Sequence, residues 1–347
     1  MSTTANGRVA NGDVSLLIGN GFSSTKTPYD TNSNYLLPKL PTDRKRTFVA
    51  LGLLAFAWIA NDVALAWIHE RVPTGAKPLP DLFFSIFSEY PHLVSVTEII
   101  IGTNITLAIL VCCVFHRYRW IVARRCFMIF ALAFSGRAIC MTLIQLPVPS
   151  VHTYCGPKVN RTSFALIVGR VSRMLFSLGL DSVSGGRDLC GDLVYSGHSV
   201  TVLTAALSIN QYFPYLRGRW GRLLRTIAVN ASYYGALSAM FCILLARKHY
   251  TIDVLMAYFV CTRLFWTYHA CIEHHLYVYR YSYHYGLPVG GHSADNGFSL
   301  NNRRKSTRRT TTLSNVIWYP IFYYLEHDVN REITNNISFP SIYPVSS

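Results

Sequence analysis

The chain has 347 residues, of which 51% are hydrophobic and only 14% are charged, and its mean hydropathy is +0.25. Soluble domains carry roughly 25% charged residues, so this composition argues against an ordinary soluble domain and indicates a membrane protein. The formal net charge is +15 at pH 7. The basic residues stand in short clusters between apolar runs and no nucleic-acid-binding motif is present, so we expect no nucleic-acid partner.

The chain begins with a polar segment, residues 1–42, which is rich in Gly, Ser, Thr and Asn. It lacks the apolar core of a signal peptide, and we predict a disordered cytosolic tail. Residues 43–275 are predicted to form the transmembrane catalytic domain. Residues 276–347 are predicted to form a cytosolic C-terminal tail.

Six apolar stretches lie in the predicted domain, each close to the roughly 20 residues that a transmembrane helix needs. They are residues 47–68, 93–115, 126–146, 199–213, 224–245 and 252–270. A further amphipathic run, residues 163–180, carries Arg170 and Arg173. It is too polar to span comfortably, so we predict an interfacial helix there. The sequence therefore predicts an all-α membrane protein with six transmembrane helices.

Clusters of Lys and Arg orient these helices. One cluster precedes the first stretch, one separates the second from the third, one separates the fourth from the fifth, and one follows the sixth. With six spans all four clusters fall on the same side, which the positive-inside rule makes cytosolic, so both termini are predicted to be cytosolic. The clustered residues are Arg44, Lys45, Arg46, Arg117, Arg119, Arg124, Arg125, Arg217, Arg219, Arg222, Arg225, Arg303, Arg304, Lys305, Arg308 and Arg309.

The opposite, exoplasmic side receives a long loop between residues 147 and 197. This loop contains an Asn-Arg-Thr glycosylation acceptor pattern at Asn160. It also contains Cys155 and Cys190, which would face an oxidising compartment. We hypothesise a disulfide between these two cysteines.

Two exoplasmic segments carry the candidate chemistry: "CGDLVYSGHSV" at 190–200 and "KHYTID" at 248–253. His249 and Asp253 have i,i+4 spacing and share a face if that turn is helical. The aspartate can hold one ring nitrogen of His249 and leave the other free to attack a phosphodiester phosphorus. His198 is placed to protonate the departing alcohol and to accept a proton from the incoming one. A single histidine is more often structural, and two can bind a metal, so only the combination predicts catalysis.

Arg137 lies deep in the third apolar stretch, where a charge is costly unless it is paired or hydrated. It can contact phosphate or pair with a buried acid such as Asp62 or Glu98. Basic groups in the exoplasmic turn can neutralise phosphate oxygens, and tyrosines can surround a quaternary ammonium. The predicted substrate-binding residues are Arg137, Asp192, Tyr195, Arg247, Lys248 and Tyr250, with Tyr154 and Trp266 as further aromatic candidates.

At these residues the chain resembles a known family. "CGDLVYSGHSV" resembles the CGDxxxSGHT segment of the sphingomyelin synthases, and "HYTIDVLMAYFVCTRLFWTYH" at 249–269 is similar to the longest signature of that family. Three other segments are also similar, in the right order: "KPLPDLFF" at 77–84, "LPVPSVHTYC" at 146–155 and "WYPIFYYLE" at 318–326. The wider lipid phosphate phosphatase superfamily shares the SGH and HxxxD elements.

The resemblance implies six membrane spans and an active site that faces the Golgi lumen or the cell exterior. It implies transfer of phosphocholine from phosphatidylcholine to the primary hydroxyl of ceramide, which gives sphingomyelin and diacylglycerol. The family's catalytic residues match His198, His249 and Asp253, with His249 as nucleophile, and no metal cofactor is implied. Ser199 stands where the family usually has threonine, and residues 1–40 are too short for the SAM domain of some members.

Three other functions stay open from the sequence. A ceramide phosphoethanolamine synthase would use phosphatidylethanolamine as donor. A lipid phosphate phosphatase would use water as acceptor, although the Arg-Pro pair of its usual first motif is absent from this sequence. A lipid-binding scaffold would give no reason for two histidines and an aspartate on one face. The headgroup, the acyl-chain preference, the choice between Golgi and plasma membrane, and a homo-oligomer are also left open.

Overall fold

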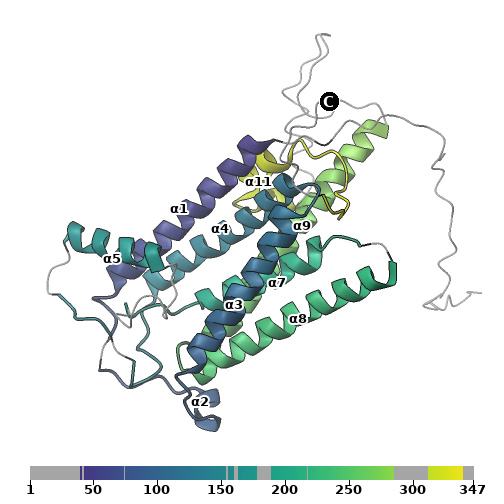
Figure 1. Cartoon of the computed structure of the whole chain (residues 1–347). Helices are drawn as coiled ribbons and strands as arrows, with labels where there is room; N and C mark the ends of the chain where they lie inside the picture. Colours follow the sequence, from purple (N-terminus) through teal and green to yellow (C-terminus); the bar gives the residue numbers. More distant parts are fainter. Residues whose placement is uncertain are drawn as a thin grey trace, which may run out of the picture. The chain divides into compact units, whose positions relative to one another are not determined.

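The computed structural model describes residues 40, 43–73, 75–153, 155–159, 163–177, 189–216, 218–284 and 312–338. Within these ranges the regular elements are helices, and the only bridge is an isolated one between His116 and Ile337. The predicted all-α class is confirmed for this part of the chain (Figure 1). Most of the predicted tail at 1–42, the acceptor Asn160, and Tyr154, Arg217 and the basic residues at 303–309 lie outside the described residues.

Each of the six predicted apolar stretches forms a long helix. They are α1 (Arg44–Ile68), α3 (Leu93–Ile109, continued by the π-turn η1, Leu110–Val114), α4 (Arg119–Leu143), α7 (Gly197–Tyr212), α8 (Gly218–Leu245) and α9 (Thr251–His284). The predicted interfacial run forms α5 (Phe164–Ser177). The remaining elements are short: α2 (Leu82–Ile86), the 3-10 turn η2 (Thr312–Asn315) and α11 (Tyr319–Glu326).

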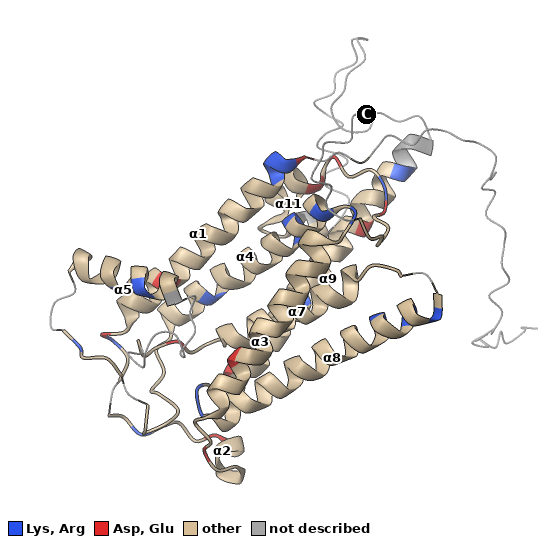
Figure 2. Cartoon of the chain, viewed as in Figure 1, with Lys and Arg blue, Asp and Glu red and all other residues tan. Residues whose placement is uncertain are grey.

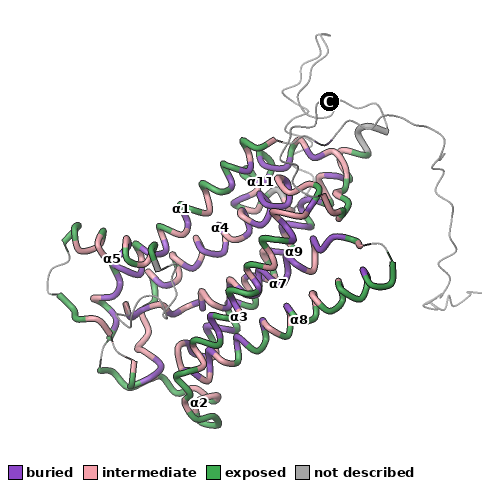
Figure 3. Tube along the Cα trace, in the orientation of Figure 1, coloured by how far each residue is buried: buried purple, intermediate pink, exposed green. Residues whose placement is uncertain are grey.

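Four of these helices are long and apolar enough to cross a membrane, by length and composition: α1, α3 with η1, α4 and α8. The 16 residues of α7 span about 24 Å, whereas the 34 residues of α9 span about 50 Å. The helices α3, α4, α8 and α9 pack around α7, which is mostly buried (Figure 3). A helix enclosed in this way needs no lipid-facing surface of its own.

Small residues contribute to the contacts between the helices. Buried alanines come from α1, α4, α7, α8 and α9, and small side chains let transmembrane helices pack at short distance. They include Ala57, Ala133, Ala206, Ala236 and Ala257. Large apolar side chains on the outer faces are instead exposed, for example Phe56 at 71% and Leu237 at 59%. Small residues inside the bundle and large apolar residues on its outer surface suit a bundle surrounded by lipid.

The short helices α2 and α5 lie at the end of the bundle where α1 and α8 finish (Figure 1). The opposite ends of α1 and α8 carry basic residues (Figure 2). On α5, Arg170 is buried against α1, where it donates to the Ala66 carbonyl at 3.1 Å and to Glu70 at 2.6 Å. Phe164 and Phe176 on the same helix are 83% and 88% exposed, which leaves an apolar outer face as an interfacial helix requires.

Helix α4 begins at Arg119, before the predicted apolar stretch that starts at residue 126. Arg124 and Arg125, predicted to lie in a loop, belong instead to the helix and are buried. Arg125 donates from Nε and from a terminal nitrogen to Glu326 of α11 at 3.1 and 2.7 Å. Arg124 lies 3.6 Å from the same carboxylate. The helix can extend through these charges because the Glu326 carboxylate compensates one of the two positive charges and attracts the other.

Residues 312–338 therefore pack onto the bundle. Phe322 and Leu325 of α11 are buried in one apolar cluster with Phe265 and Tyr268 of α9. Burial raises the pKa of Glu326, but the two arginine charges outweigh burial and lower that pKa below its usual value. The carboxylate that anchors this segment is thus ionised at neutral pH.

We predict that Glu326→Gln destabilises the protein by about 3–5 kcal/mol, because removing one partner of a buried ion pair leaves an uncompensated charge. Thermal unfolding in detergent micelles would measure the loss. Glu332→Gln is the matched control, since its ion pair with Arg280 has side chains 66% and 76% exposed. Its expected effect is below about 0.5 kcal/mol. Equal effects of the two substitutions would contradict the structural role of Glu326.

Candidate active site

Two segments far apart in the sequence bring a pair of histidines together. His198 is the second residue of α7, whose first turn is capped by Ser196 accepting from the Ser199 amide at 3.2 Å. His249 lies two residues before α9. The centroids of the two imidazole rings are 6.0 Å apart and the rings are inclined at 63°. At this separation the two rings are direct neighbours, so both can act on the same phosphate group.

Asp253 joins the two segments. Its side chain is fully buried and accepts from the Tyr250 amide at 3.0 Å and from the Val194 amide at 3.2 Å. Its backbone carbonyl accepts from the Ser196 amide at 3.3 Å. The aspartate therefore fixes the start of α9 against the segment that leads into His198.

The carboxylate of Asp253 lies beside the nucleophile candidate but does not hydrogen-bond to it in this structure. Nδ1 of His249 is 3.7 Å from Oδ2 of Asp253, beyond the 2.7–3.2 Å of a hydrogen bond. No described residue supplies another partner for Nδ1. His249 precedes the helix, so the predicted sharing of a helical face does not apply, although the two groups are close. Such contacts are often long without substrate and shorten in the reacting complex.

Arg137 is buried against the segment that leads into His198. It donates from Nε to the Tyr195 carbonyl at 2.9 Å and from a terminal nitrogen to Asn61 at 2.6 Å, and it contacts Asp192. A Cβ atom added to Gly197 would lie 3.2 Å from the guanidinium carbon. Glycine at this position therefore lets the residue before His198 pack directly on the charge.

The carboxylate in contact with Arg137 is Asp192, rather than the Asp62 or Glu98 suggested by the sequence. Asp62 and Asp253 nevertheless lie within electrostatic range of the guanidinium. Asp192 is 37% exposed, so the pair extends from the bundle interior toward solvent. Two of the predicted substrate-binding residues thus neutralise each other.

Three other predicted substrate-binding residues use their polar atoms to hold neighbouring segments. The Tyr195 hydroxyl donates to the Ala133 carbonyl in α4. The Tyr250 hydroxyl accepts from the Leu79 amide and donates to the Pro147 carbonyl, both at 3.0 Å. Arg247 donates to the Phe84 carbonyl at 3.1 Å and lies over the Phe84 ring.

Two further predicted residues have different positions. Lys248 lies half-buried in the same turn as His249. Trp266 is on α9, about 20 Å along the helix axis from Asp253, and it is 48% exposed. The tryptophan is therefore too far from the histidines to surround a headgroup bound there.

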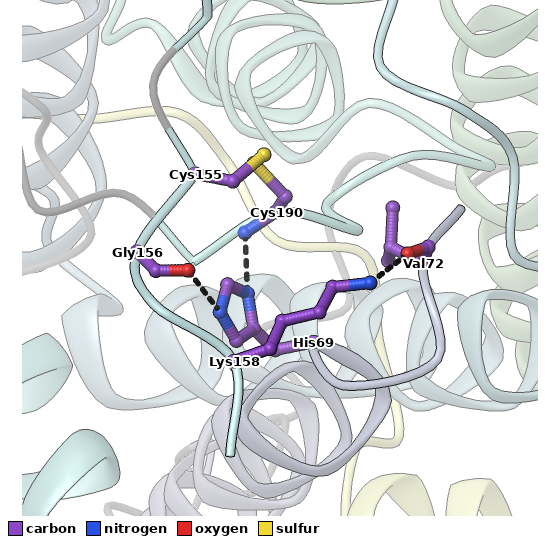
Figure 4. The surroundings of a disulfide bond; sticks show 6 residues. All are labelled: His69, Val72, Cys155, Gly156, Lys158 and Cys190. Atoms are coloured by element: carbon purple, nitrogen blue, oxygen red, sulfur yellow. Dashed lines mark hydrogen bonds between the residues drawn. A yellow bond between two sulfur atoms is a disulfide. The ribbon is translucent and has the colours of Figure 1, made fainter. Parts of the chain in front are cut away.

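The disulfide that we hypothesised from the sequence is present. Cys155 and Cys190 are bonded, with their Cα atoms 5.5 Å apart. The buried His69, at the end of α1, accepts from the Cys190 amide at 2.9 Å and donates to the Gly156 carbonyl at 3.1 Å (Figure 4). Burial, followed by the charge of Arg170, lowers the pKa of His69. The neutral ring that results is the form that can accept at one nitrogen and donate at the other.

Sequence reasoning missed His69 and also Asp81, which lies at the start of α2. The carboxylate of Asp81 accepts from the amide and the hydroxyl of Thr251, at 2.8 and 2.9 Å. Asp81 belongs to the "KPLPDLFF" segment, and an aspartate before an apolar run is typical of a helix cap. That local signal does not reveal a partner at Thr251, 170 positions along the chain.

Known proteins match the same region. The family model "PAP2 superfamily C-terminal" matches residues 189–270, which include both histidines and Asp253. Sphingomyelin synthase-related 2 of Caenorhabditis elegans is 44% identical over 224 residues, 65% of this chain and 65% of that protein. Phosphatidylcholine:ceramide cholinephosphotransferase 2 of Mus musculus is 34% identical over 312 residues, 88% of this chain and 74% of that protein.

A third relative, phosphatidylcholine:ceramide cholinephosphotransferase 1 of Caenorhabditis elegans, is 31% identical over 309 residues, 88% of this chain. The chain spans only 57% of the length of that protein, as it spans 65% of sphingomyelin synthase-related 2. The match to the mouse protein extends well beyond the histidine segments and covers almost three quarters of it. On this similarity the chain belongs to the sphingomyelin synthase family.

Proposed function

We propose that the protein transfers phosphocholine from phosphatidylcholine to the primary hydroxyl of ceramide, forming sphingomyelin and diacylglycerol. The names of the mouse and nematode relatives support this activity. The single observation that carries it is the approach of His198 to His249 within 6.0 Å, beside the buried Asp253. Two imidazoles facing one space suit a transfer that needs both an attacking group and a proton donor.

In the first step, His249 attacks the phosphorus of phosphatidylcholine. Since Nδ1 faces Asp253, Nε2 is the attacking atom. The P–O bond to diacylglycerol breaks, and protonated His198 gives its proton to the departing oxygen. The phosphocholine group is then carried on His249, and the negative Asp253 stabilises the positive charge on the ring.

In the second step, the primary hydroxyl of ceramide attacks the same phosphorus. His198, now neutral, accepts the hydroxyl proton, and the P–N bond breaks. Sphingomyelin leaves, His249 is neutral again and His198 is protonated, so the cycle closes without an external acid or base. Water has to be kept out of the site during this step, because it would compete with ceramide as acceptor.

The substrate contacts stay a prediction. Lys248 adds positive charge beside His249, which favours a phosphate. Arg137 is paired with Asp192, so a phosphate that binds Arg137 would have to displace that carboxylate. Asp192, Tyr195, Arg247 and Tyr250 hold the surrounding segments, as the contacts described above indicate. Their effect on substrate would then be through the shape of the site.

We further propose six membrane spans, with α7 and α9 as the fourth and sixth, and with both termini in the cytosol. The central position of α7 and the length of α9 support this count. The active site then faces the Golgi lumen or the cell exterior. The disulfide in the 147–197 loop supports an oxidising compartment on that side. Residues 1–42 and 276–347 would be the cytosolic tails of the 43–275 catalytic domain, although α9 runs through the boundary to His284.

The headgroup prediction is tested by product identity. Purified protein is incubated with fluorescent ceramide and with either phosphatidylcholine or phosphatidylethanolamine, and the products are identified by mass spectrometry. We expect sphingomyelin from the first donor as the main product. Ceramide phosphoethanolamine as the main product would identify the alternative synthase. Release of free phosphate from phosphatidate, without transfer to ceramide, would identify a lipid phosphate phosphatase.

The topology prediction uses the disulfide. In sealed microsomes with the cytosolic face outward, a membrane-impermeant reductant and maleimide should label Cys155 and Cys190 only after the membrane is permeabilised. The control is Arg219→Cys, at an exposed position on the start of α8, which should be labelled without permeabilisation. Labelling of both sites in sealed vesicles would refute the proposed orientation.

The nucleophile prediction uses His249→Ala, which should lower transfer by at least about a thousandfold in a protein that still folds. With labelled phosphatidylcholine and no ceramide, the unchanged protein should retain acid-labile label and the variant should not. His92→Ala, at an exposed histidine before α3, is the control and should keep full activity. Asp253→Asn should slow transfer without changing the product. Normal transfer by folded His249→Ala protein would rule out the nucleophile.

A further inference from the structure

The segment at 79–90, here called the strap, is hydrogen-bonded along its length to the turn that carries His249. Its first contact is between the Leu79 amide and the Tyr250 hydroxyl at 3.0 Å. Its last is between the Tyr90 amide and the Leu245 carbonyl at 2.9 Å. The strap therefore spans the whole connection from the end of α8 to the start of α9.

The middle of the strap holds Arg247, two residues before His249. The Arg247 guanidinium donates to the carbonyls of Phe84 and Phe87 at 3.1 and 3.4 Å, and it lies 5.1 Å from the centre of the Phe84 ring. Arg247 has a φ of +49°, which an arginine rarely adopts. The strap contacts help to hold the turn in this conformation.

Asp81 makes the strongest contact between the strap and α9. Oδ2 accepts from the Thr251 amide at 2.8 Å, and Oδ1 accepts from the Thr251 hydroxyl at 2.9 Å. Oδ1 also accepts from the Phe83 amide at 2.9 Å and so caps α2. Thr251 is the first residue of α9, and the first amides of a helix lack partners within it. One carboxylate thus caps two helices, the second of them from a distant part of the chain.

Thr251 lies midway between His249 and Asp253. Fixing its amide and hydroxyl fixes the backbone that joins the two groups, and with it the direction in which the imidazole leaves the turn. We propose that Asp81 is the positioning residue of this site: by capping α9 at Thr251, it holds His249 against Asp253 and toward His198. The inference rests on the function proposed above and names a residue on which that function depends.

A carboxylate suits this role better than an amide. Asp81 uses both oxygens as acceptors toward Thr251, whereas asparagine offers one oxygen and one donor group. Its negative charge also favours the N-terminus of α9, where the helix dipole is positive. Asp81→Asn is therefore a small change in size that removes one cap and most of the charge interaction.

The test compares Asp81→Asn, Thr251→Val and Thr251→Ser in the full-length protein. Steady-state transfer to fluorescent ceramide gives kcat and KM, and hydrogen–deuterium exchange reports on the amides at 247–254. We expect Asp81→Asn and Thr251→Val each to lower kcat at least about tenfold, because small misplacements of reacting groups are costly, and to raise exchange in this segment. KM should change less than about threefold, since the strap orients His249 rather than substrate. Thr251→Ser keeps the hydroxyl and should stay near the original kcat.

The matched control is Asp43→Asn, which removes the carboxylate charge from the cap of α1 at the other end of the bundle, where Asp43 accepts from the Lys45 amide at 3.0 Å. It should leave kcat and exchange at 247–254 unchanged. An unchanged kcat in Asp81→Asn and Thr251→Val, or a raised KM alone, would overturn the positioning role. An active His249→Ala protein would overturn the proposed nucleophile instead. The exchange measurement does not need that activity, so the two failures are distinguishable.

Discussion

The position of His198 depends on how one buried charge is neutralised. Arg137 is 2% exposed within an apolar helix, and an unpaired charge there costs several kcal/mol. Its partners are Asn61 on α1 and the Asp192 and Tyr195 groups of the segment before α7. That segment is therefore drawn onto α4, where Gly197 packs on the guanidinium. The contacts that neutralise Arg137 therefore fix the position of His198, which follows Gly197 at the start of α7.

The same constraint acts at the opposite end of α4, with a different outcome. Arg124 and Arg125 are buried there, and their carboxylate comes from Glu326. The ion pair adds α11 to the bundle formed by α1, α4 and α9. Buried arginines near both ends of α4 thus bind a segment that is not a transmembrane helix. One segment leads into His198, and the other is α11.

The sequence predicted the long helices well because apolar length is a local signal. The extension of α4 before residue 126 was not predicted, because the burial of Arg124 and Arg125 depends on a residue two hundred positions away. Motif and topology together placed His198, His249 and Asp253 at one end. The ties at His69 and Asp81 could not be predicted, since each joins a side chain to a distant backbone amide. Likewise, the contacts of Arg247 and Tyr250 with the loops follow from tertiary structure.

The contacts of His69 and Asp81 have one feature in common: each lies at the end of a helix, which is where the proposed activity needs its polar groups. Lipid phosphates lie at the membrane interface, so a group that attacks them has to stand at a helix end rather than inside the bundle. Helix ends have unsatisfied amides and loops with many conformations. The disulfide removes some of that freedom by cross-linking the loop, and His69 and Asp81 remove more of it by accepting from backbone amides. Since these contacts form outside the apolar helices, the outer faces stay compatible with lipid while the loops that carry the candidate residues are fixed.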